Sequence, residues 1–359
     1  YNHVGPEGNV LGRFGPYFTG AYRTPWGDAV NVAGPGSDHV RRYFIENAVG
    51  WIRDFHLDGL RLDAVDSIFD PTPIPFVQEL TSAVHAAADA AGRTAIVTIE
   101  SSANDPSVVR SVDEHGWGCD AVWNDDMHHA LRVALTGDRH QYYASFTGAV
   151  DVASAWERRW VYSGQYSPGF DRRRGAPADD IDHRCFIVFD TNHDHVGNTP
   201  AGARLLADAP ANDPRHRLAA AAILLSPFTP MLFMGEEYGE TAPFAYFVDH
   251  SEPELLDAVR AGREREFSGA DWSGEIADPA DPATFGAAVL DVTLTDREPH
   301  RSRLAMYTEL LRIRREYPVL TSSAAQQHVS IVGDTIFVVR STRADTASLI
   351  FNFSDQLVD

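Results

Sequence analysis

Short apolar runs alternate with stretches of helical periodicity along much of the chain, and this alternation limits the fold more than any other feature. The apolar runs predict buried strands at 59–63, 95–99, 119–123, 185–189 and 230–234. Helical spacing predicts helices at 37–55, 75–91, 106–114, 126–135 and 213–225. Nearly continuous apolar strands separated by helices are typical of a parallel sheet that is covered on both faces. The pattern therefore predicts the α/β class.

Two α/β architectures fit this order, a closed (β/α)8 TIM barrel and an open doubly wound sheet. Polar clusters follow several different strands at their C-terminal ends, which is where the active sites of barrels are assembled. The Gly-x-Gly-x-x-Gly and Walker-type loops that often mark the open sheet are absent from the sequence. These features favour the barrel.

The length of 359 residues and a hydrophobic content of 44% allow one large domain and a small one. We predict a catalytic barrel over 1–317, with a long ordered loop at 4–36 that is rich in Gly, Pro and aromatic residues. The acidic stretch 262–300 is predicted to be loop-like, and 301–316 forms an amphipathic helix. Short strands at 329–332, 335–339 and 348–352 then predict the start of a small antiparallel β domain over 318–359.

Acidic residues outnumber basic ones by 51 to 30, which gives a net charge of -21 and argues against nucleic acid or an anionic membrane as a partner. Two cysteines, Cys119 and Cys185, are too few for a disulfide framework, and we expect a reducing, cytoplasmic compartment. The sequence has no run of about 18 apolar residues. Because it begins at Tyr1 inside a motif, we expect an N-terminally truncated chain. Nothing in the composition bears on the oligomeric state.

Arg61 and Asp63 stand two residues apart in an otherwise apolar run, so on a strand they share one face. The guanidinium would then hold the carboxylate of Asp63 ionised at neutral pH, as a carboxylate nucleophile requires. Taken alone, the pair fits an ordinary structural ion pair equally well. Three further polar clusters favour a functional role, and they are Tyr1-Asn2-His3, residues 98–101 and residues 191–194.

Asp63, Glu100 and Asp194 would converge at the mouth of a barrel, where three carboxylates suit either a metal cage or acid/base chemistry at an acetal. Glycoside hydrolysis with retention needs an ionised nucleophile and a protonated acid about 5 Å apart. Glu100 follows an apolar run, so desolvation and neighbouring carboxylates could raise its pKa. Asp194 would bind sugar hydroxyls and stabilise oxocarbenium charge, and His3 and His193 would contact the same sugar.

A metal site is the alternative, because His193-Asp194-His195 and His128-His129 supply imidazoles. If the segment were extended, His193 and His195 would share a face and Asp194 would point away from both. An arginine beside Asp63 is also unfavourable for a divalent cation. We therefore expect no metal and no cofactor.

Together, Tyr1-Asn2-His3, Gly59 to Asp63, Glu100 and Asn192-His193-Asp194 resemble the four ordered sequence regions of the α-amylase family of retaining glycoside hydrolases. Within it, the chain is most similar to the trehalohydrolase subfamily. The matching segments are 2–9, 24–27, 192–198, 234–239, 246–250 and 262–267. The resemblance implies cleavage of the α-1,4 bond next to the terminal trehalose of maltooligosyl trehalose, with release of trehalose and a maltooligosaccharide.

The resemblance also implies a role for each matching residue. Asp63 would be the nucleophile, Glu100 the general acid/base and Asp194 the transition-state stabiliser. The substrate-binding residues would be Arg61, His3 and His193 for the sugar before the scissile bond, Asp66 and Ser67 for the trehalose side, and Trp26 as a sugar-stacking surface.

Some residues depart from the family pattern. His195 stands where glutamine is expected and Ile99 where alanine is usual, which affects fine substrate positioning. The first two barrel strands and most of the third are missing from the matched region, so the chain alone is expected to fold poorly and to show little activity. The rival functions are a general α-amylase, a glycogen branching enzyme, and an inert carbohydrate-binding barrel.

Overall fold

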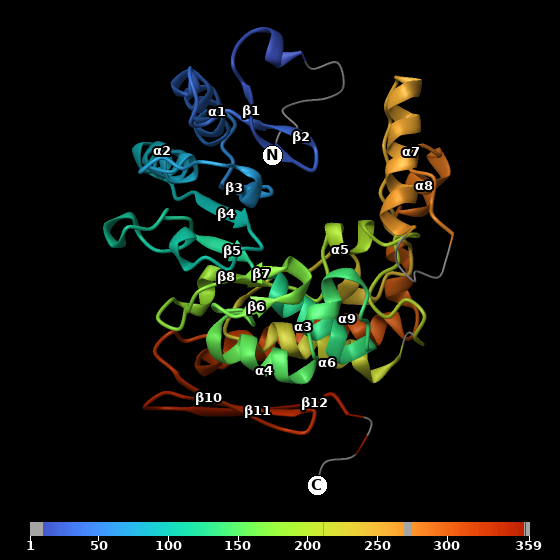
Figure 1. Cartoon of the computed structure of the whole chain (residues 1–359). Helices are drawn as coiled ribbons and strands as arrows, with labels where there is room; N and C mark the ends of the chain where they lie inside the picture. The colour runs from blue at the N-terminus through green and yellow to red at the C-terminus, as the bar shows by residue number, and fades with distance from the viewer. Residues whose placement is uncertain (1–9, 211, 269–274, 355, 357–359) are drawn as a thin grey trace. The chain divides into compact units, whose positions relative to one another are not determined.

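The computed structural model describes residues 10–210, 212–268, 275–354 and 356. The chain divides into two compact units. Unit 1 comprises Tyr1–Asn124 and Arg174–Ile187, and unit 2 comprises Asp125–Arg173 and Val188–Asp359. Figure 1 shows the elements of both units in chain order.

The centre of unit 1 is a parallel sheet whose strands follow the predicted order. It contains β3 (Gly59–Leu62), β4 (Ile96–Glu100), β5 (Ala121–Trp123) and the first two residues of β8 (Phe186–Val188). Val97 and Ile99 of β4 are fully buried. A side chain at Gly59 would place its Cβ 2.3 Å from the carbonyl oxygen of Ile96, so only glycine allows β3 and β4 to lie this close.

Two helices, α1 (Ser37–Arg53) and α2 (Phe76–Ala90), lie side by side in unit 1 (Figure 1). The buried side chain of Arg41 connects them to the loop that follows β3. Its guanidinium lies 2.8 Å from Asp70 and 2.7 Å from Glu79 in two ion pairs. It also donates hydrogen bonds to the carbonyl oxygens of Val32 and Ile74.

The prediction of a long loop over 4–36 is wrong at residues 18–30. Residues 18–30 form an antiparallel hairpin of β1 (Phe18–Thr24) and β2 (Gly27–Val30), with Pro25-Trp26 at the turn. An irregularity in the register between Thr19 and Arg23 interrupts the strand pattern, which explains why the sequence gives little sign of it. The helix expected at 106–114 is instead two 3-10 turns, η3 (Pro106–Val108) and η4 (Val112–Glu114).

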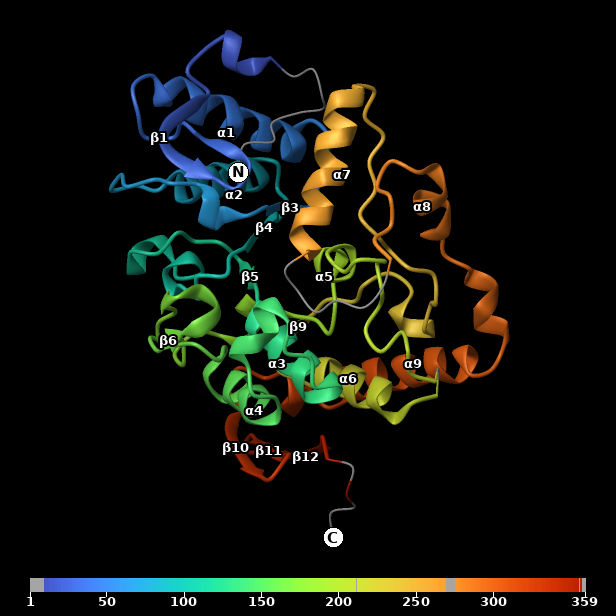
Figure 2. The ribbon, with the colours of Figure 1, turned by 45° about the vertical axis from the view of Figure 1, so that its right-hand side comes forward.

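In unit 2, α6 (Pro214–Leu224) packs against α9 (His300–Glu316), as Figure 2 shows. Their contact is a core cluster of Ala220, Leu224 and Tyr307, against which Leu232, Met306 and Leu310 are packed. Unit 2 also contains α3 (Asp125–Thr136), α4 (Ala149–Arg158) and β9 (Thr229–Pro230). The backbone N–H of Met231, next to β9, donates to the carbonyl oxygen of Val188 at 2.8 Å.

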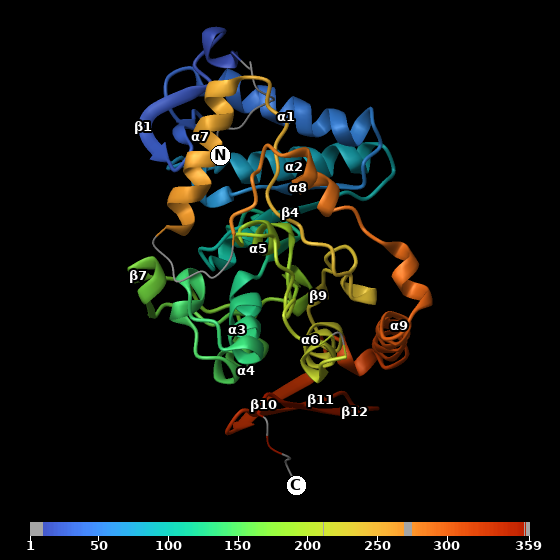
Figure 3. The same ribbon diagram turned by 90° about the vertical axis from the view of Figure 1, so that its right-hand side faces the viewer.

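The C-terminal strands form the predicted antiparallel sheet, with β11 (Thr335–Ser341) between β10 (Gln326–Val332) and β12 (Thr346–Asn352). The sheet contacts α4 and α6 (Figure 3). Arg340 of β11 is fully buried and donates hydrogen bonds to Val319 O, Gln327 Oε1 and Ser322 O. Burial lowers the pKa of its guanidinium to about 10.

The prediction of a loop-like stretch at 262–300 is wrong in part. The structure places the end of α7 (Pro253–Phe267), α8 (Pro282–Ala287) and the 3-10 helix η9 (Val292–Asp296) there, with irregular segments between the described helices. Of the α7 residues only Phe267 is buried, so the helix lacks the apolar stripe by which sequence periodicity is detected. The remaining elements are η1 (Leu11–Arg13), η2 (Val65–Ser67), η5 (Gln141–Ser145), β6 (Tyr166–Ser167), η6 (Pro168–Phe170), β7 (Arg172–Arg173), η7 (His183–Cys185), α5 (His193–Gly197), η8 (Glu236–Tyr238) and η10 (Pro318–Leu320). Within the described ranges, no helix has both the length and the apolar content that crossing a membrane requires.

Candidate active site

The C-terminal ends of β3, β4 and β5 bring together polar residues that lie far apart in the sequence. The parallel register pairs Arg61 with Thr98 and Glu100 with Trp123. Because side chains alternate along a strand, Arg61 and Asp63 project from the same face, and so do Thr98 and Glu100. The register thus explains why the polar clusters after successive strands meet in unit 1.

Arg61 forms an ion pair and a hydrogen bond with the carboxylate of Asp63, as their spacing predicts. Its Nη2 also lies 2.9 Å from Glu100 Oε2, although the angle does not make a hydrogen bond. The guanidinium carbon sits 4.2 Å from the centre of the Trp123 ring, which fixes the plane of the group. The Arg61 guanidinium therefore lies beside both carboxylates. The sequence predicted its contact with Asp63 but not its contact with Glu100.

The backbone at Ala64 gives Glu100 a second partner. The Ala64 N–H donates to Glu100 Oε2 at 2.9 Å. Ala64 has a φ of +42°, a left-handed conformation that costs a residue with a side chain about 1–2 kcal/mol. The contact turns the chain after β3 so that its amide faces the carboxylate at the end of β4. The strained backbone at Ala64 is therefore the same backbone that donates the hydrogen bond to Glu100.

Asp66, in the 3-10 turn η2, reaches the segment that follows Glu100. Its carboxylate accepts hydrogen bonds from Ser101 Oγ at 2.6 Å, from the Ser102 N–H at 2.8 Å and from Ser102 Oγ at 2.8 Å. The sequence singled out Asp66 only as a substrate contact. Its partners lie about 35 residues away, so no local signal pointed to them.

Asp194 belongs to unit 2, at the start of the short helix α5. The side chain of Asn192 caps this helix by accepting a hydrogen bond from the His195 N–H at 2.9 Å. His193 Nε2 lies 3.5 Å from Asp194 Oδ1, and both side chains are about half exposed. The segment is helical and not extended, so the premise from which the sequence argued against metal binding by His193-Asp194-His195 does not hold.

His195 instead joins His128 and His129 of α3 in a group whose ring nitrogens lie within 4.8 Å of one another. The rings of His128 and His195 are stacked, with centroids 3.6 Å apart and planes 14° from parallel. The nitrogen lone pairs lie in the ring planes, so stacked rings cannot both direct one at a single ion. The two nitrogens of His128 also face Asp190 O at 2.7 Å and Tyr143 Oη at 3.2 Å. This geometry suits packing behind α5 better than metal binding.

The neutral state of these histidines follows from their surroundings. Burial lowers the pKa of His128 well below its usual value, and the neighbouring His195, His129 and Arg132 add to the effect. Burial lowers the pKa of His195 in the same way. The stacked rings of His128 and His195 are therefore uncharged at neutral pH.

Two further contacts in unit 2 involve the surroundings of Asp194. Arg263 of α7 donates to Gly197 O at 2.8 Å and to Asn198 Oδ1 at 3.1 Å, which ties the end of α5 to α7. Burial raises the pKa of Tyr142, and the charges of Glu266 and Asp194 raise it further. Sequence reasoning used the 262–267 segment only as a family motif and missed the contact that Arg263 makes.

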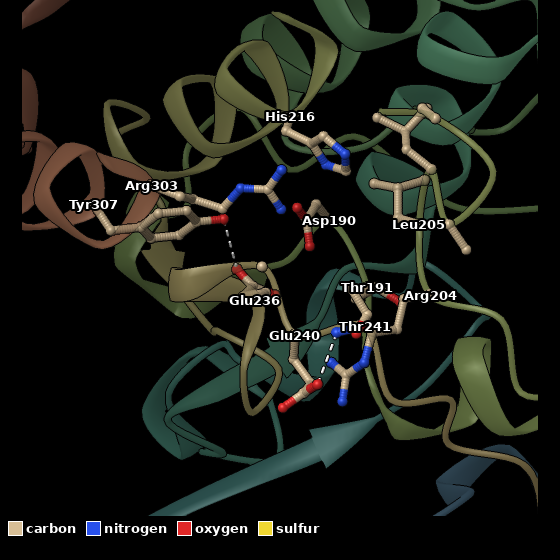
Figure 4. Close-up of a pocket in the computed structure, with 14 residues that line it drawn as sticks. Asp190, Thr191, Arg204, Leu205, His216, Glu236, Glu240, Thr241, Arg303 and Tyr307 are labelled. Carbon is tan, nitrogen blue, oxygen red and sulfur yellow. Dashed lines mark hydrogen bonds between the residues drawn. The ribbon is translucent and has the colours of Figure 1, made fainter. Parts of the chain in front are cut away.

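A cavity of about 110 Å³ in unit 2 is lined by Asp190, Arg204, His216, Glu236, Arg303 and Tyr307 among others (Figure 4). Burial raises the pKa of Glu236 well above its usual value, and the nearby Asp190 adds to this rise. The pKa of Asp190 is raised by burial as well. Both pKa values are thus raised in the same direction, because two carboxyls that are this close and poorly solvated resist carrying charge together.

The other predicted site residues are less constrained. Trp26 lies at the tip of the β1–β2 hairpin with 46% of its surface exposed. Ser67 ends the turn η2, and its N–H donates to Ala64 O. His3 lies outside the described residues. Arg61, Asp63, Glu100, Asp66 and Ser67 are thus placed in unit 1, and His193 and Asp194 in unit 2.

Comparison with known proteins points to one group. The chain is 46% identical over 321 residues to the malto-oligosyltrehalose trehalohydrolase of Arthrobacter ramosus, covering 89% of the chain and 56% of that protein. It is 41% identical over 317 residues to the protein of the same name from Saccharolobus solfataricus, covering 88% and 53%. The chain therefore spans about half the length of these relatives. No protein-family model matches it.

The structure agrees with the sequence comparison. A solved structure from Salmonella typhimurium, provisionally described as an α-amylase, matches with a TM-score of 0.88 and 35% identity over the whole chain and 62% of its own length. The parallel sheet of unit 1 and the matched sequence segments agree with that likeness. The chain belongs to the α-amylase family, among the malto-oligosyltrehalose trehalohydrolases.

Proposed function

We propose that this protein is a retaining glycoside hydrolase that cleaves the α-1,4 bond adjacent to the terminal trehalose of maltooligosyl trehalose. The products are trehalose and a maltooligosaccharide. The names of the relatives support the substrate, and the site supports the chemistry. The observation that carries the proposal is the guanidinium of Arg61 beside the carboxylates of Asp63 and Glu100 at two adjacent strand ends.

Asp63 and Glu100 divide the two roles that the reaction requires. A carboxylate oxygen of Asp63 attacks the anomeric carbon while Glu100 gives its proton to the departing glycosidic oxygen. In the second step, Glu100 takes a proton from a water molecule as that water attacks the anomeric carbon of the glycosyl ester, and Asp63 is released as a carboxylate. The exposed side-chain fractions support this division, since Asp63, which must reach the anomeric carbon, is 41% exposed and Glu100 is 19% exposed.

The remaining roles are proposed from the family resemblance, residue by residue. Asp194 stabilises the oxocarbenium charge, and its half-exposed carboxylate beside His193 supports that assignment. Arg61, His3 and His193 bind the sugar before the scissile bond, and Trp26 offers an exposed ring for stacking. Ser67 is proposed for the trehalose side because it lies shortly beyond the nucleophile. Asp66, which the sequence also singled out for that side, has its carboxylate on Ser101 and Ser102 instead.

The same proposal extends to the architecture. The parallel strands β3, β4, β5 and β8 would be consecutive parts of a (β/α)8 barrel of the α-amylase type, within a catalytic domain at 1–317. Residues 318–359 would begin a separate C-terminal β domain. The three-stranded antiparallel sheet β10–β12 supports this division.

Product analysis tests the function. The protein as its gene encodes it is incubated with maltooligosyl trehalose and, separately, with maltooligosaccharide of the same length. We expect free trehalose from the first and slow cleavage of the second, with both reactions abolished in Asp63→Asn. Branched products would favour a branching enzyme instead. Equal cleavage of the two substrates would favour a general α-amylase, and unaltered hydrolysis in Asp63→Asn would contradict the proposed nucleophile.

A further inference from the structure

The segments that carry Asp63 and Glu100 are joined by two sets of hydrogen bonds that run in opposite directions. In one set, the Ala64 N–H donates to Glu100 Oε2, so the segment after β3 holds the carboxylate of β4. In the other, Ser101 and Ser102 donate three hydrogen bonds to the carboxylate of Asp66, so the segment after β4 holds the turn after β3. Each segment therefore fixes the position of the other.

The serine segment is also held from its far side, within unit 1. Arg174, which is buried, donates to the carbonyl oxygen of Ser102 at 2.7 Å. The backbone N–H groups of Gly175 and Ala176 donate to Ala103 O and Asn104 O, both at 3.1 Å. Residues 102–104 thus lie on a firm support, and Asp66 is the group that connects this support to the turn behind the nucleophile.

Asp66 uses its charge in a way that a neutral residue cannot reproduce. A carboxylate accepts at both oxygens, and Asp66 receives one donor at Oδ1 and two at Oδ2. An asparagine of the same shape carries no charge, and its NH2 group would have to donate to Ser101 Oγ, which is the donor in the native contact. The charge-assisted hydrogen bonds would be replaced by weaker ones, so Ser101 and Ser102 would be held less firmly.

We propose that Asp66 is a positioning residue, which sets the distance and orientation between Asp63 and Glu100 by anchoring Ser101 and Ser102 to the turn after the nucleophile. The catalytic part of this inference rests on the proposed function of Asp63 and Glu100. Asp66 itself touches no reacting atom in this role. A small shift is sufficient to matter, because a misplacement of about 1 Å at a reacting group can lower a rate on the order of 100-fold.

Kinetics of Asp66→Asn in the protein as its gene encodes it provide the first test, with Asp58→Asn as a matched control. Asp58 is an exposed aspartate at the opposite end of β3. We expect kcat to fall about 10–100-fold with KM changed less than about threefold, because alignment and not binding is lost. The loss should be equal for maltooligosyl trehalose and maltooligosaccharide. A loss confined to the trehalose substrate would show direct recognition and overturn the proposal, as would a kcat within twofold of the unchanged protein.

A substrate with an activated leaving group separates positioning from a general structural effect. Fluoride leaves α-maltosyl fluoride without needing a proton from Glu100, so misplacement of that acid should cost much less activity on this substrate. We expect Asp66→Asn to retain at least about tenfold more of the original rate on the fluoride than on maltooligosyl trehalose. Equal losses on both would contradict a role in placing Glu100.

Coupling between the partners gives a further readout. Ser102→Ala removes one of the three donors and should lower kcat less than Asp66→Asn. The double variant should be scarcely slower than Asp66→Asn alone, because both changes break the same link. Fully additive losses would contradict the proposal.

Hydrogen exchange tests the structural step without any activity. Peptides covering 61–68 and 100–105 are followed by mass spectrometry in the unchanged protein, in Asp66→Asn and in Asp58→Asn. We expect faster exchange in both peptides of Asp66→Asn alone, since freeing the Ser102 amide also loosens the Ala64–Glu100 contact. Unchanged exchange at 61–68 would overturn the coupling. If the unchanged protein releases no trehalose, the proposed function fails, and this measurement still decides the structural inference.

Discussion

The buried pair of Asp190 and Glu236 in unit 2 leads to a prediction about how stability depends on pH. Burial raises the pKa of Glu236 well above its usual value, so its carboxyl stays protonated in the folded protein at pH values where the unfolded chain has released the proton. The folded state then binds one more proton than the unfolded state. The contribution of Glu236 to stability is fully present below the pKa of the unfolded chain and is lost as pH rises toward the folded value.

The substitution Glu236→Gln removes this titration. Its amide oxygen can accept from the Phe233 N–H, which lies 2.8 Å from Glu236 Oε2, and its NH2 group would then face the Tyr307 hydroxyl, which lies 3.4 Å from Glu236 Oε1. One proton corresponds to about 1.4 kcal/mol per pH unit. Relative to the unchanged protein, the free energy of unfolding of Glu236→Gln should therefore rise by up to about 1.4 kcal/mol for each pH unit between the unfolded and the folded pKa of Glu236.

The assay is urea unfolding followed by tryptophan fluorescence at pH 5, 6, 7 and 8. The difference between the two proteins is used, because it cancels the titration of groups that both share. One such group is His216 in the same cavity, where burial lowers the pKa to about 4. Glu264→Gln, at an exposed site on α7, serves as the control and should leave the pH profile unchanged. Parallel profiles for Glu236→Gln and the unchanged protein would refute the raised pKa of Glu236.

Three further predictions concern unit 1. Arg41→Ala should lower the free energy of unfolding by about 3–5 kcal/mol, because it leaves the buried carboxylate of Asp70 without its cation. Arg42→Ala, at an exposed site, should change the free energy of unfolding little. Equal effects of the two substitutions in urea unfolding would contradict this prediction. Arg61→Lys should lower kcat about 10–100-fold in the trehalose-release assay, because an ammonium group cannot contact both carboxylates and also stack on the Trp123 ring. A loss below threefold would count against the bridging role of Arg61. Ala64→Gly should raise the free energy of unfolding by about 0.5–1 kcal/mol because φ is +42°, and Ala64→Val should lower it; the same sign for both in thermal unfolding would disprove the strain.

Local patterns in the sequence were sufficient for the order of strands and helices and for the contact of Arg61 with Asp63. Both follow from spacing within a single element, since side chains two apart on a strand share a face. The hairpin at 18–30 and the helix α7 were missed for an equally local reason. The hairpin register is irregular, and α7 buries only Phe267, so neither shows the expected period.

The supports of the candidate site could not be read from the sequence at all. Asp66 meets serines about 35 residues away, and His128 stacks on His195 from a different helix. Such contacts depend on which strand ends become neighbours. The pairing and register of the strands decide this, and neither is visible in a local stretch of sequence. His195, noted in the sequence as a departure from glutamine, is therefore explained by packing on His128.

The arrangement around Arg61 also limits how the two carboxylates can differ in charge. Two ionised carboxylates beside one guanidinium leave a net negative site, whereas one proton makes the cluster neutral. Asp63 accepts a hydrogen bond from Arg61, but Arg61 Nη2 approaches Glu100 without donating to it. The guanidinium is therefore directed at Asp63, and its contact with Glu100 is an ion pair only. The Ala64 N–H is directed at Glu100 Oε2 instead. A glycosyl group bound to Asp63 would remove the charge of that carboxylate, and Arg61 and Ala64 would then both face Glu100, the group that the second step of the proposed reaction needs as a base.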